Sequence, residues 1–328
     1  METARAPRDA KPPPADFADD AVAWAMWLYY AEARTQAEVA QVLGVSRASV
    51  ANYLAEARRR GLVAVTLEPG LLARVGLGRR LAERFGLAGA HVVPAAEGEG
   101  EAELRRRLGI AGAQVLLPRL AEGTVLGVAW GRTMLALAQA LPERALPDLR
   151  VVQVSGSSLG GETHAPEFCT ALIASRLGAR GENLHAPAIL SSRAMRDALA
   201  AEPGVARQLA RVRGCDLVVL GVGELDDLVT FSDADFLTPE VVRDYLARGA
   251  VAVVLGRFLD AGGREVKGPL TGCQIGMELA ELRAAPARVA VAGGARKIPA
   301  IRALLSGGYV TEIVTDAETA RRLAEEEP

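Results

Sequence analysis

Short apolar runs alternate with amphipathic segments from residue 71 to the C-terminus, and this alternation limits the possible folds more than any other feature. Runs at 125–130, 151–154 and 216–221 are each followed by a segment of helical periodicity. An apolar run without polar alternation predicts a strand buried on both faces, which is typical of a parallel sheet covered by helices. The sequence therefore predicts an α/β fold with a doubly wound, largely parallel sheet.

The same pattern assigns a residue range to each expected element. Strands are expected at 91–94, 125–130, 151–154, 185–189, 216–221, 250–255, 288–292 and 312–315, with a hairpin-like turn at 260–263. Helices are expected at 71–85, 99–120, 133–140, 165–177, 192–200, 203–211, 239–247, 297–305 and 316–326.

Length and composition exclude several classes of protein. A chain of 328 residues predicts two domains, or one large domain with an appendage. The longest stretch without a charge, residues 85–96, is too short to cross a bilayer, and no signal peptide is visible at the N-terminus. Cys169, Cys215 and Cys273 lack the spacing of metal ligands, so we expect a reduced cytoplasmic protein with no metal and no cofactor.

The N-terminal region is organised differently. Residues 1–15 are rich in proline and charge and predict a disordered tail. From Asp16, apolar residues at helical spacing predict a first helix of about 15 residues. Residues 62–67 form a β-type run, expected as part of a wing or a hinge strand. This pattern predicts one domain over residues 16–68 and a second over residues 69–328.

Between these segments lies the pattern of a helix-turn-helix. Thr35 and Glu38 have the spacing of a capping box, and the helix that they begin ends at Gly44, a residue that tolerates a positive φ. Ser46 is the expected N-cap of the next helix, which runs to about Arg60. This arrangement turns the first residues of the second helix outward, into the major groove of DNA.

Six residues are therefore candidates for DNA contacts. Arg47 suits guanine or phosphate and Asn52 suits adenine, whereas the position of Tyr53 in the pattern favours packing in the core over a base contact. Arg58, Arg59 and Arg60 are compatible with phosphate contacts or with a solvated helix end. The candidate set is Gln36, Ser46, Arg47, Ser49, Asn52 and Tyr53.

Net charge at first opposes this interpretation. The whole chain has a formal net charge of −2, and residues 1–70 contain 8 basic and 9 acidic side chains. Phosphate binding requires clustered cations rather than an overall positive charge. We therefore expect each DNA-binding domain to bind weakly alone and to depend on paired domains in an oligomer.

Ligands of open α/β sheets bind beyond the carboxyl ends of the strands. Four loops there are rich in small or cationic residues: 130–133, 155–161, 221–224 and 292–297. Backbone N–H groups, hydroxyls and helix N-termini in such loops bind anions, and Arg132 and Lys297 supply charge. Only three of the 38 cationic residues are lysines, namely Lys11, Lys267 and Lys297. Since the loops match neither a dinucleotide nor a Walker A motif, a phosphorylated small molecule is the favoured ligand.

The motifs together resemble the SorC/DeoR-type transcriptional regulators with a C-terminal sugar-binding domain. The resemblance is carried by the segment 28–61, Trp-Gly-Arg-Thr at 130–133, Gly-Arg-Phe-Leu-Asp at 256–260, and Ala-Gly-Gly to Lys297 at 292–297. It implies a sugar-phosphate isomerase/deaminase-like fold without catalysis and a homo-oligomer, usually a tetramer, whose grip on operator DNA changes when a phosphorylated sugar binds.

The resemblance also implies roles for residues of the larger domain. Lys297 is the expected phosphate cation, Asp260 a polar partner, and the loop of Gly156, Ser157 and Ser158 the effector loop. With the strand-end positions, the candidate effector-binding set is Arg132, Thr133, Gly156, Ser157, Ser158, Glu224, Asp260 and Lys297.

An alternative function is a sugar-phosphate isomerase or deaminase that carries an accessory DNA-binding domain. Such chemistry needs an acid and a base that converge on the sugar carbonyl. Asp260 and Glu224 are the candidates, but no histidine has a supporting arrangement. We therefore expect a regulator of a carbohydrate operon and no catalysis.

Overall fold

The computed structural model describes residues 14–17, 19–63, 69–94, 98–157, 164–225 and 237–325. The chain divides into two compact units, residues 1–68 and 69–328, called unit 1 and unit 2 below. Most of the predicted tail, most of the β-type run at 62–67, and Ser158 lie outside the described residues. Within the described part of the chain, no helix is long and apolar enough to cross a membrane.

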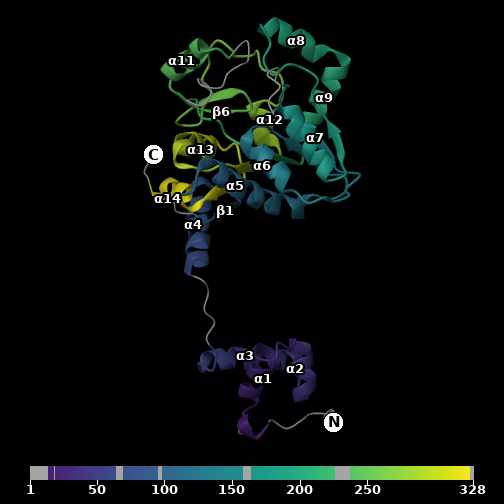
Figure 1. Ribbon diagram of the computed structural model, residues 1–328, viewed down its shortest axis with the longest axis vertical. Helices are drawn as coiled ribbons and strands as arrows, with labels where there is room; N and C mark the ends of the chain where they lie inside the picture. Colours follow the sequence, from purple (N-terminus) through teal and green to yellow (C-terminus); the bar gives the residue numbers. More distant parts are fainter. Residues whose placement is uncertain are drawn as a thin grey trace, which may run out of the picture. The chain divides into compact units, whose positions relative to one another are not determined.

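Unit 1 is a small helical unit (Figure 1). It contains η1 (Ala15–Phe17), α1 (Ala21–Tyr30), α2 (Gln36–Leu43) and α3 (Arg47–Arg59). Its core is formed by Trp24, Ala25, Leu28, Val39, Val50 and Leu54. The prediction of one continuous first helix from Asp16 is wrong, because the chain turns at Asp20. The Asp20 carboxylate accepts the N–H groups of Val22 and Ala23 and so begins α1 at Ala21, five residues after Asp16.

The predicted ends of α2 and α3 are confirmed. Thr35 and Glu38 form both halves of a capping box, with 2.8 Å from the Thr35 N–H to Glu38 Oε2. Gly44 ends α2 with φ of 67°, the left-handed conformation that favours glycine. The Ser46 hydroxyl accepts the N–H of Ser49 at 3.1 Å and begins α3.

Unit 2 is built on a seven-stranded sheet in which every pair of neighbouring strands is parallel. The strands are β1 (Gly89–Val93), β2 (Val125–Val128), β3 (Arg150–Gln153), β4 (Arg180–Glu182), β5 (Leu217–Leu220), β8 (Ala287–Val291) and β9 (Glu312–Asp316). Their order across the sheet is β1-β9-β8-β5-β2-β3-β4. The predicted doubly wound, largely parallel sheet is confirmed.

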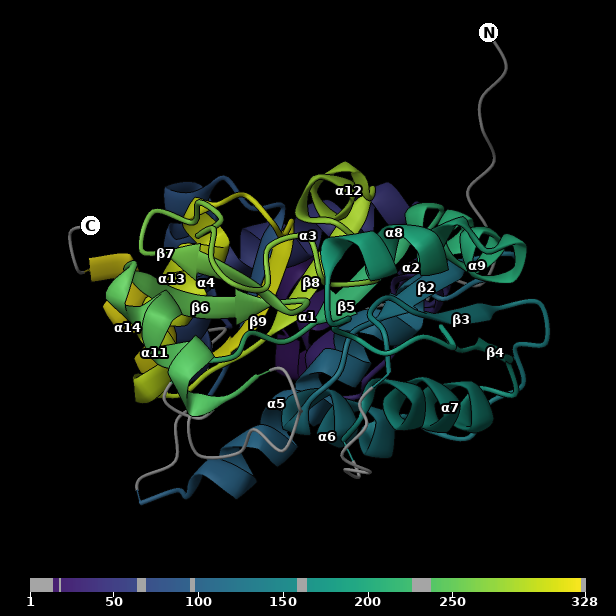
Figure 2. The same ribbon diagram turned by 90° about the horizontal axis from the view of Figure 1, so that it is seen from above.

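Helices cover both faces of this sheet (Figure 2). One face packs against α5 (Glu101–Leu116), α6 (Arg132–Ala140) and α7 (Pro166–Arg176). The other packs against α4 (Pro69–Phe85), α9 (Pro203–Arg213), α12 (Leu279–Ala284), α13 (Ile298–Ser306) and α14 (Ala317–Glu325). Leu217 and Val219 contribute to the first layer, and Val218 and Leu220 to the second. This alternation explains why β5 is apolar throughout.

The remaining elements of unit 2 connect these strands and helices. They are η2 (Leu117–Arg119), α8 (Arg193–Ala201), α11 (Pro239–Ala247), η3 (Ala295–Lys297) and the strands β6 (Ala250–Val254) and β7 (Arg257–Asp260).

One strand prediction is wrong, and one predicted strand lies outside the parallel sheet. The strand expected at 185–189 is absent there, and the edge strand β4 lies earlier, at the polar sequence Arg180-Gly181-Glu182. The apolar strand β6 does not join the parallel sheet but pairs with β7 in a separate antiparallel hairpin. Leu255 and Gly256, both with positive φ, form the tight turn of this hairpin. The predicted turn at Asp260–Gly263 follows β7.

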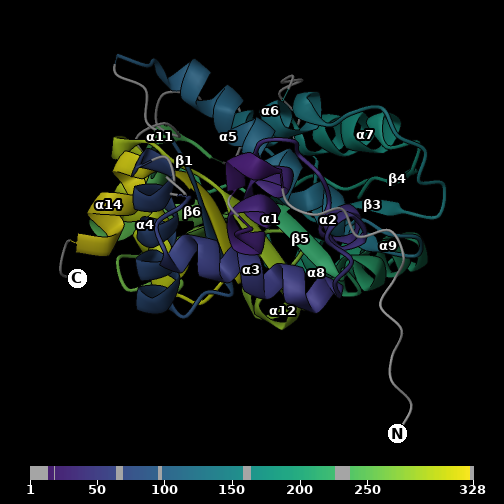
Figure 3. The same ribbon diagram turned by 90° about the horizontal axis from the view of Figure 1, so that it is seen from below.

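The first and last elements of unit 2 are neighbours. β9 lies between β1 and β8, and α4 packs beside α14 (Figure 3). Arg84 near the end of α4 donates to the carbonyl of Ala324 at 2.8 Å.

Candidate functional site

The exposed start of α3 is the candidate DNA-binding surface of unit 1. Arg47, Ala48 and Asn52 are exposed, and Ser49 is half-buried. Arg47 Nε lies 3.5 Å from the side-chain oxygen of Gln36 at the start of α2, so the two helices contribute neighbouring polar groups. The surface therefore has both donors and acceptors for base edges.

Two of the six candidates have structural duties as well. The Ser46 hydroxyl is engaged as the cap of α3, where it also lies 2.9 Å from the Ser49 hydroxyl. The Tyr53 ring is half-buried and packs against the core of unit 1, which agrees with the packing alternative.

The arginines at the end of α3 differ from one another in their partners. Arg59 pairs with Glu56 at 2.6 Å, and Arg60 forms a two-armed ion pair with Asp20 across unit 1. The Arg60 guanidinium holds the pKa of the Asp20 carboxyl below its usual value. Arg58 is exposed, and no ion pair joins it to an acid among the described residues. Arg58 is therefore the best placed of the three for a phosphate contact.

In unit 2, successive strands are added on one side of β2 and then on the opposite side of β5. We call this place in the sheet, between β2 and β5, the reversal point. From β2 the chain proceeds to β3 and β4 on one side, and from β5 it proceeds to β8 and β9 on the other. β2 and β5 are neighbours, so their carboxyl ends border the crevice in which doubly wound sheets bind ligands. The four loops predicted as ligand-binding follow the four adjacent strands β8, β5, β2 and β3.

The loop after β2 contains Arg132 and Thr133 at the start of α6. Gly131 has φ of 114° and donates its N–H to the carbonyl of His164 at 3.1 Å. The rings of Trp130 and His164 stack with centroids 6.3 Å apart. These contacts join the loop after β2 to the segment that leads into α7.

The loops after β8 and β5 meet through side chains. Lys297 Nζ donates to the carbonyl of Val222 at 3.0 Å. Arg296 pairs with the largely buried carboxylate of Glu224 at 3.3 Å. The structure therefore joins the loop that contains Lys297 to the loop that contains Glu224, beside the reversal point.

The described part of the loop after β3 does not have the expected arrangement. The N–H groups of Gly156 and Ser157 donate to the carbonyls of Ile275 and Ala186, at 3.0 and 2.7 Å. The Ser157 hydroxyl is bonded to Gln153 Nε2 at 3.2 Å. These two N–H groups are therefore engaged within unit 2, and the role of this loop in effector binding stays a prediction.

Asp260 is also separate from the other candidates. Its carboxylate accepts the backbone N–H and the Nε–H of Arg264, both at 2.9 Å, within the turn after β7. The N–H of Arg264 holds the pKa of Asp260 below its usual value. The turn packs at Gly263 against Gly307, just beyond the C-terminal end of α13, whereas Lys297 lies at the N-terminal end. Asp260 therefore does not converge with Lys297.

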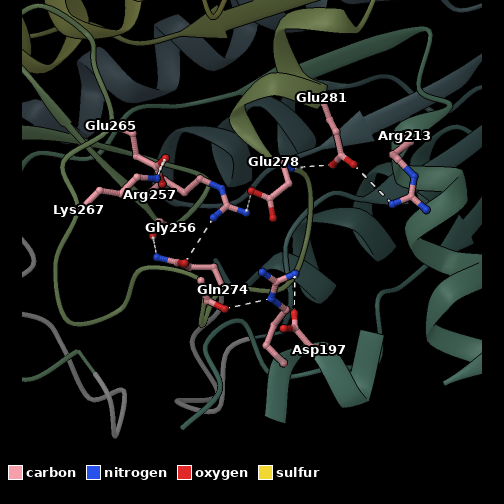
Figure 4. A network of polar contacts seen from close by, with 11 residues as sticks. Asp197, Arg213, Gly256, Arg257, Glu265, Lys267, Gln274, Glu278 and Glu281 are labelled. Atoms are coloured by element: carbon pink, nitrogen blue, oxygen red, sulfur yellow. Dashed lines mark hydrogen bonds and ion pairs between the residues drawn. The ribbon is translucent and has the colours of Figure 1, made fainter. Parts of the chain in front are cut away.

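The structure also reveals a buried polar cluster that the sequence did not indicate as functional. We call Arg257, Gln274 and Glu278 the Arg257 cluster (Figure 4). Arg257 pairs with Glu278 at 2.8 Å and lies 3.4 Å from the Gln274 oxygen. Its sequence signals are a charged residue at the otherwise apolar start of β7 and the place of Arg257 in the Gly-Arg-Phe-Leu-Asp motif at 256–260. In the described ranges of the chain, no group of His, Cys, Asp and Glu side chains is arranged to hold a metal ion.

Comparisons with known proteins cover both units of the chain. A family model described as "Putative sugar-binding domain" matches residues 71–325, and a "Sigma-70, region 4" model matches residues 21–60. The chain belongs to the SorC/DeoR-type family of transcriptional regulators. The regulator is 33% identical to the transcriptional regulator YjhU of Escherichia coli over 311 residues, which cover 94% of this chain and 95% of YjhU.

The names of two further relatives state what they regulate. The regulator is 30% identical to the erythritol catabolism regulatory protein EryD of Brucella abortus, with coverage of 93% and 97%. The full-length sorbitol operon regulator SorC of Klebsiella pneumoniae superposes with a TM-score of 0.72 at 26% identity, covering 93% of this chain and 98% of SorC. These relatives are named as regulators and not as enzymes, and this chain is likewise a transcriptional regulator with a sugar-binding domain.

Proposed function

We propose that unit 1 binds operator DNA of a carbohydrate operon and that a phosphorylated sugar, bound at the carboxyl edge of the unit 2 sheet, changes this binding. The main support is the contact between the loop of Lys297 and the loop of Glu224 beside the reversal point, next to the loop that contains Arg132 and Thr133. Cations there suit a phosphate, and the carboxylate suits sugar hydroxyls. The relatives named for erythritol and sorbitol support a sugar or polyol as the effector.

The proposal includes a homo-oligomer, a tetramer built as a dimer of dimers, in the bacterial cytoplasm where operator DNA lies. Effector binding in unit 2 would change the spacing of the paired copies of unit 1 relative to the operator half-sites. A coupling free energy of about 1–3 kcal/mol changes DNA affinity about 5–150-fold, which is sufficient for regulation.

Replacement of Lys297 tests the phosphate site. We expect Lys297→Ala to abolish the effect of sugar phosphates on operator binding and to leave operator affinity itself unchanged. Lys267→Ala is the matched control, because Lys267 is exposed and pairs only locally with Glu265. Operator affinity is measured by fluorescence anisotropy with and without each sugar phosphate. An unchanged response in Lys297→Ala would remove Lys297 from the site.

A thermal-shift panel identifies the effector class. A ligand that binds only the folded state raises the melting temperature by mass action. We expect phosphorylated sugars and polyols to raise it more than their unphosphorylated forms. Equal shifts for both forms would contradict the phosphate part of the proposal. Isomerisation of a sugar phosphate by the purified protein, without operator binding, would support the enzyme alternative instead.

A further inference from the structure

The Arg257 guanidinium is buried, but its hydrogen bonds are incomplete. The side chain is 3% exposed, and its Nε–H has no hydrogen-bond partner among the described residues. Glu278 binds one terminal nitrogen of the guanidinium only, and Gln274 faces the other at the long distance of 3.4 Å. Buried donors are almost always hydrogen-bonded, because burial removes the water that would bind them and an unpaired donor recovers none of that free energy.

The position of the cluster connects it to the ligand-binding edge. Gly276, between Gln274 and Glu278, forms a β-bridge with Ser155, directly after β3. On the other side, Val253 of the β6/β7 hairpin bridges Gly223 in the loop after β5. The cluster is therefore held by the loops of two strands that flank β2. The Ser155 hydroxyl, also buried, is a second polar group without a partner in the described part of the chain.

The cluster also reaches solvent. The Glu278 side chain is 45% exposed, whereas Arg257 beneath it is buried. Figure 4 shows Arg257 between Glu278 and Gln274, with Gln274 held in turn by the carbonyl of Gly256 at 3.2 Å. Glu278 is therefore the part of the cluster that solvent reaches, whereas the unpartnered Arg257 Nε–H is buried.

This pairing of donor and acceptor defines the chemistry of the ligand group. A hydroxyl can accept from the Arg257 Nε–H and donate to the Glu278 carboxylate at the same time. A phosphate oxygen can accept but cannot donate, and it would be repelled by Glu278. The cluster therefore suits the uncharged part of a sugar rather than its phosphate.

We propose that Arg257 and Glu278 form a hydroxyl-recognition subsite that determines which sugar or polyol the regulator accepts. This inference rests on the proposed sugar-binding function of unit 2 and adds a second, uncharged end to that site. Lys297 and the reversal point bind the charged end, and the Arg257 cluster distinguishes a ligand with a hydroxyl at the matching carbon from one without it.

The test compares hydroxylated ligands with their deoxy analogues on the full-length protein. The probes are ribose 5-phosphate with 2-deoxyribose 5-phosphate, glucose 6-phosphate with 2-deoxyglucose 6-phosphate, the corresponding free sugars, and the polyols erythritol and sorbitol with their phosphates. Dissociation constants are measured by calorimetry for the wild type, Glu278→Gln and Arg257→Lys. Glu281→Gln is the control variant, since Glu281 pairs with Arg213 and accepts the Glu278 N–H at 2.8 Å, a cap bond that a glutamine oxygen can keep.

We expect the wild type and Glu281→Gln to prefer at least one hydroxylated probe. Glu278→Gln and Arg257→Lys should bind that probe about tenfold to a hundredfold more weakly, because a hydrogen bond to a charged group is lost. Where a deoxy analogue is available, its affinity should change little. An unchanged preference in both variants, or a lower melting temperature without any change in preference, would show a purely structural ion pair and overturn the inference.

The same panel separates this inference from the proposed phosphate site. Equal binding of phosphorylated and free sugars, with the hydroxyl preference lost in Glu278→Gln, would refute the phosphate site and support the subsite. A strong phosphate preference with no effect of Glu278→Gln would do the reverse. Absence of binding to every probe would overturn both.

Discussion

Arg47 and Gln36 come from different helices, and their side chains meet at the start of α3. The sequence alone predicted both residues, because the capping box and Gly44 determine the direction of the two helices. It could not predict that Arg60 is paired with Asp20, since forty residues separate them. The same limit applies to Gly156 and Ser157, whose N–H groups are used by carbonyls far along the chain, and to Arg257, whose partners lie after β7.

Replacement of Arg47 tests base recognition. We expect Arg47→Ala to weaken specific operator binding by about 1–3 kcal/mol, the typical contribution of an arginine that binds a base edge. Arg58→Ala is the comparison, because Arg58 is exposed at the other end of α3 and should lower the affinity for operator and random DNA equally. Anisotropy titrations with operator and random DNA measure both affinities. An equal loss of affinity for the two DNAs in Arg47→Ala would show that Arg47 contacts phosphate and not a base.

The Asp20–Arg60 ion pair predicts a dependence on pH. The pKa of Asp20 is lowered in the folded state, so its contribution is present above the unfolded value of 3.8 and is lost as the pH falls through the lower folded value. Asp20→Asn should keep the cap of α1, because asparagine is an equally good N-cap, and should reduce the loss of stability below about pH 4.

This prediction can be measured by urea unfolding between pH 3 and pH 7. Trp24 and Trp27 report on unit 1 when Trp130 is replaced by phenylalanine. Glu38, whose pKa is lowered by the Thr35 N–H, should retain part of the acid sensitivity in Asp20→Asn. Identical pH profiles for the wild type and Asp20→Asn would show that the ion pair does not contribute to stability.

At the scale of elements, most helices and buried strands follow from periodicity and caps. The predictions of strands failed where the local sequence gives little information about strand position or pairing. The edge strand β4 is polar and short, so it lacks the apolar run that predicts a strand. β6 has the composition of a central strand but pairs with β7 in a separate hairpin. The turn at Leu255–Gly256 decides this pairing, and a leucine with positive φ is not expected from sequence.

Two glycines of α4 allow a matched test of helix packing. A Cβ at Gly78 would lie 2.4 Å from the carbonyl oxygen of Ala90 in β1, whereas a Cβ at Gly76 would meet only Arg80 at 3.9 Å. Gly78→Ala should therefore destabilise unit 2 by about 1–3 kcal/mol, and Gly76→Ala should stabilise it by about 0.5–1 kcal/mol through helix propensity. Chemical unfolding measures both, and equal effects would contradict the close approach of α4 to β1.

At the scale of the whole molecule, the charge balance of the N-terminal region matters most. Residues 1–70 have 8 basic and 9 acidic side chains, and the structure neutralises Arg59 and Arg60 internally. Few cations therefore remain to bind phosphates, and the number of phosphate contacts determines non-specific affinity. A single copy of unit 1 should bind DNA weakly.

Operators with one or two half-sites test this expectation. If two copies of unit 1 act together, an operator with two correctly spaced half-sites should bind about 10²–10⁴-fold more tightly than one with a single half-site. Insertion of half a helical turn between the half-sites should remove the advantage, while insertion of a full turn should restore part of it. Equal affinities for all these DNAs would exclude paired binding.

The position of β9 between β1 and β8 has a consequence for synthesis of the chain. The first strand of unit 2 cannot join the sheet until the last strand has left the ribosome, because β9 separates them. The contacts within unit 1 join residues close to the N-terminus. Unit 1 can therefore fold early, because domains fold as units and N-terminal domains leave the ribosome first. A nascent chain would thus possess its DNA-binding helices well before it possesses a complete effector domain, and regulation by the effector would begin only after β9 has emerged from the ribosome.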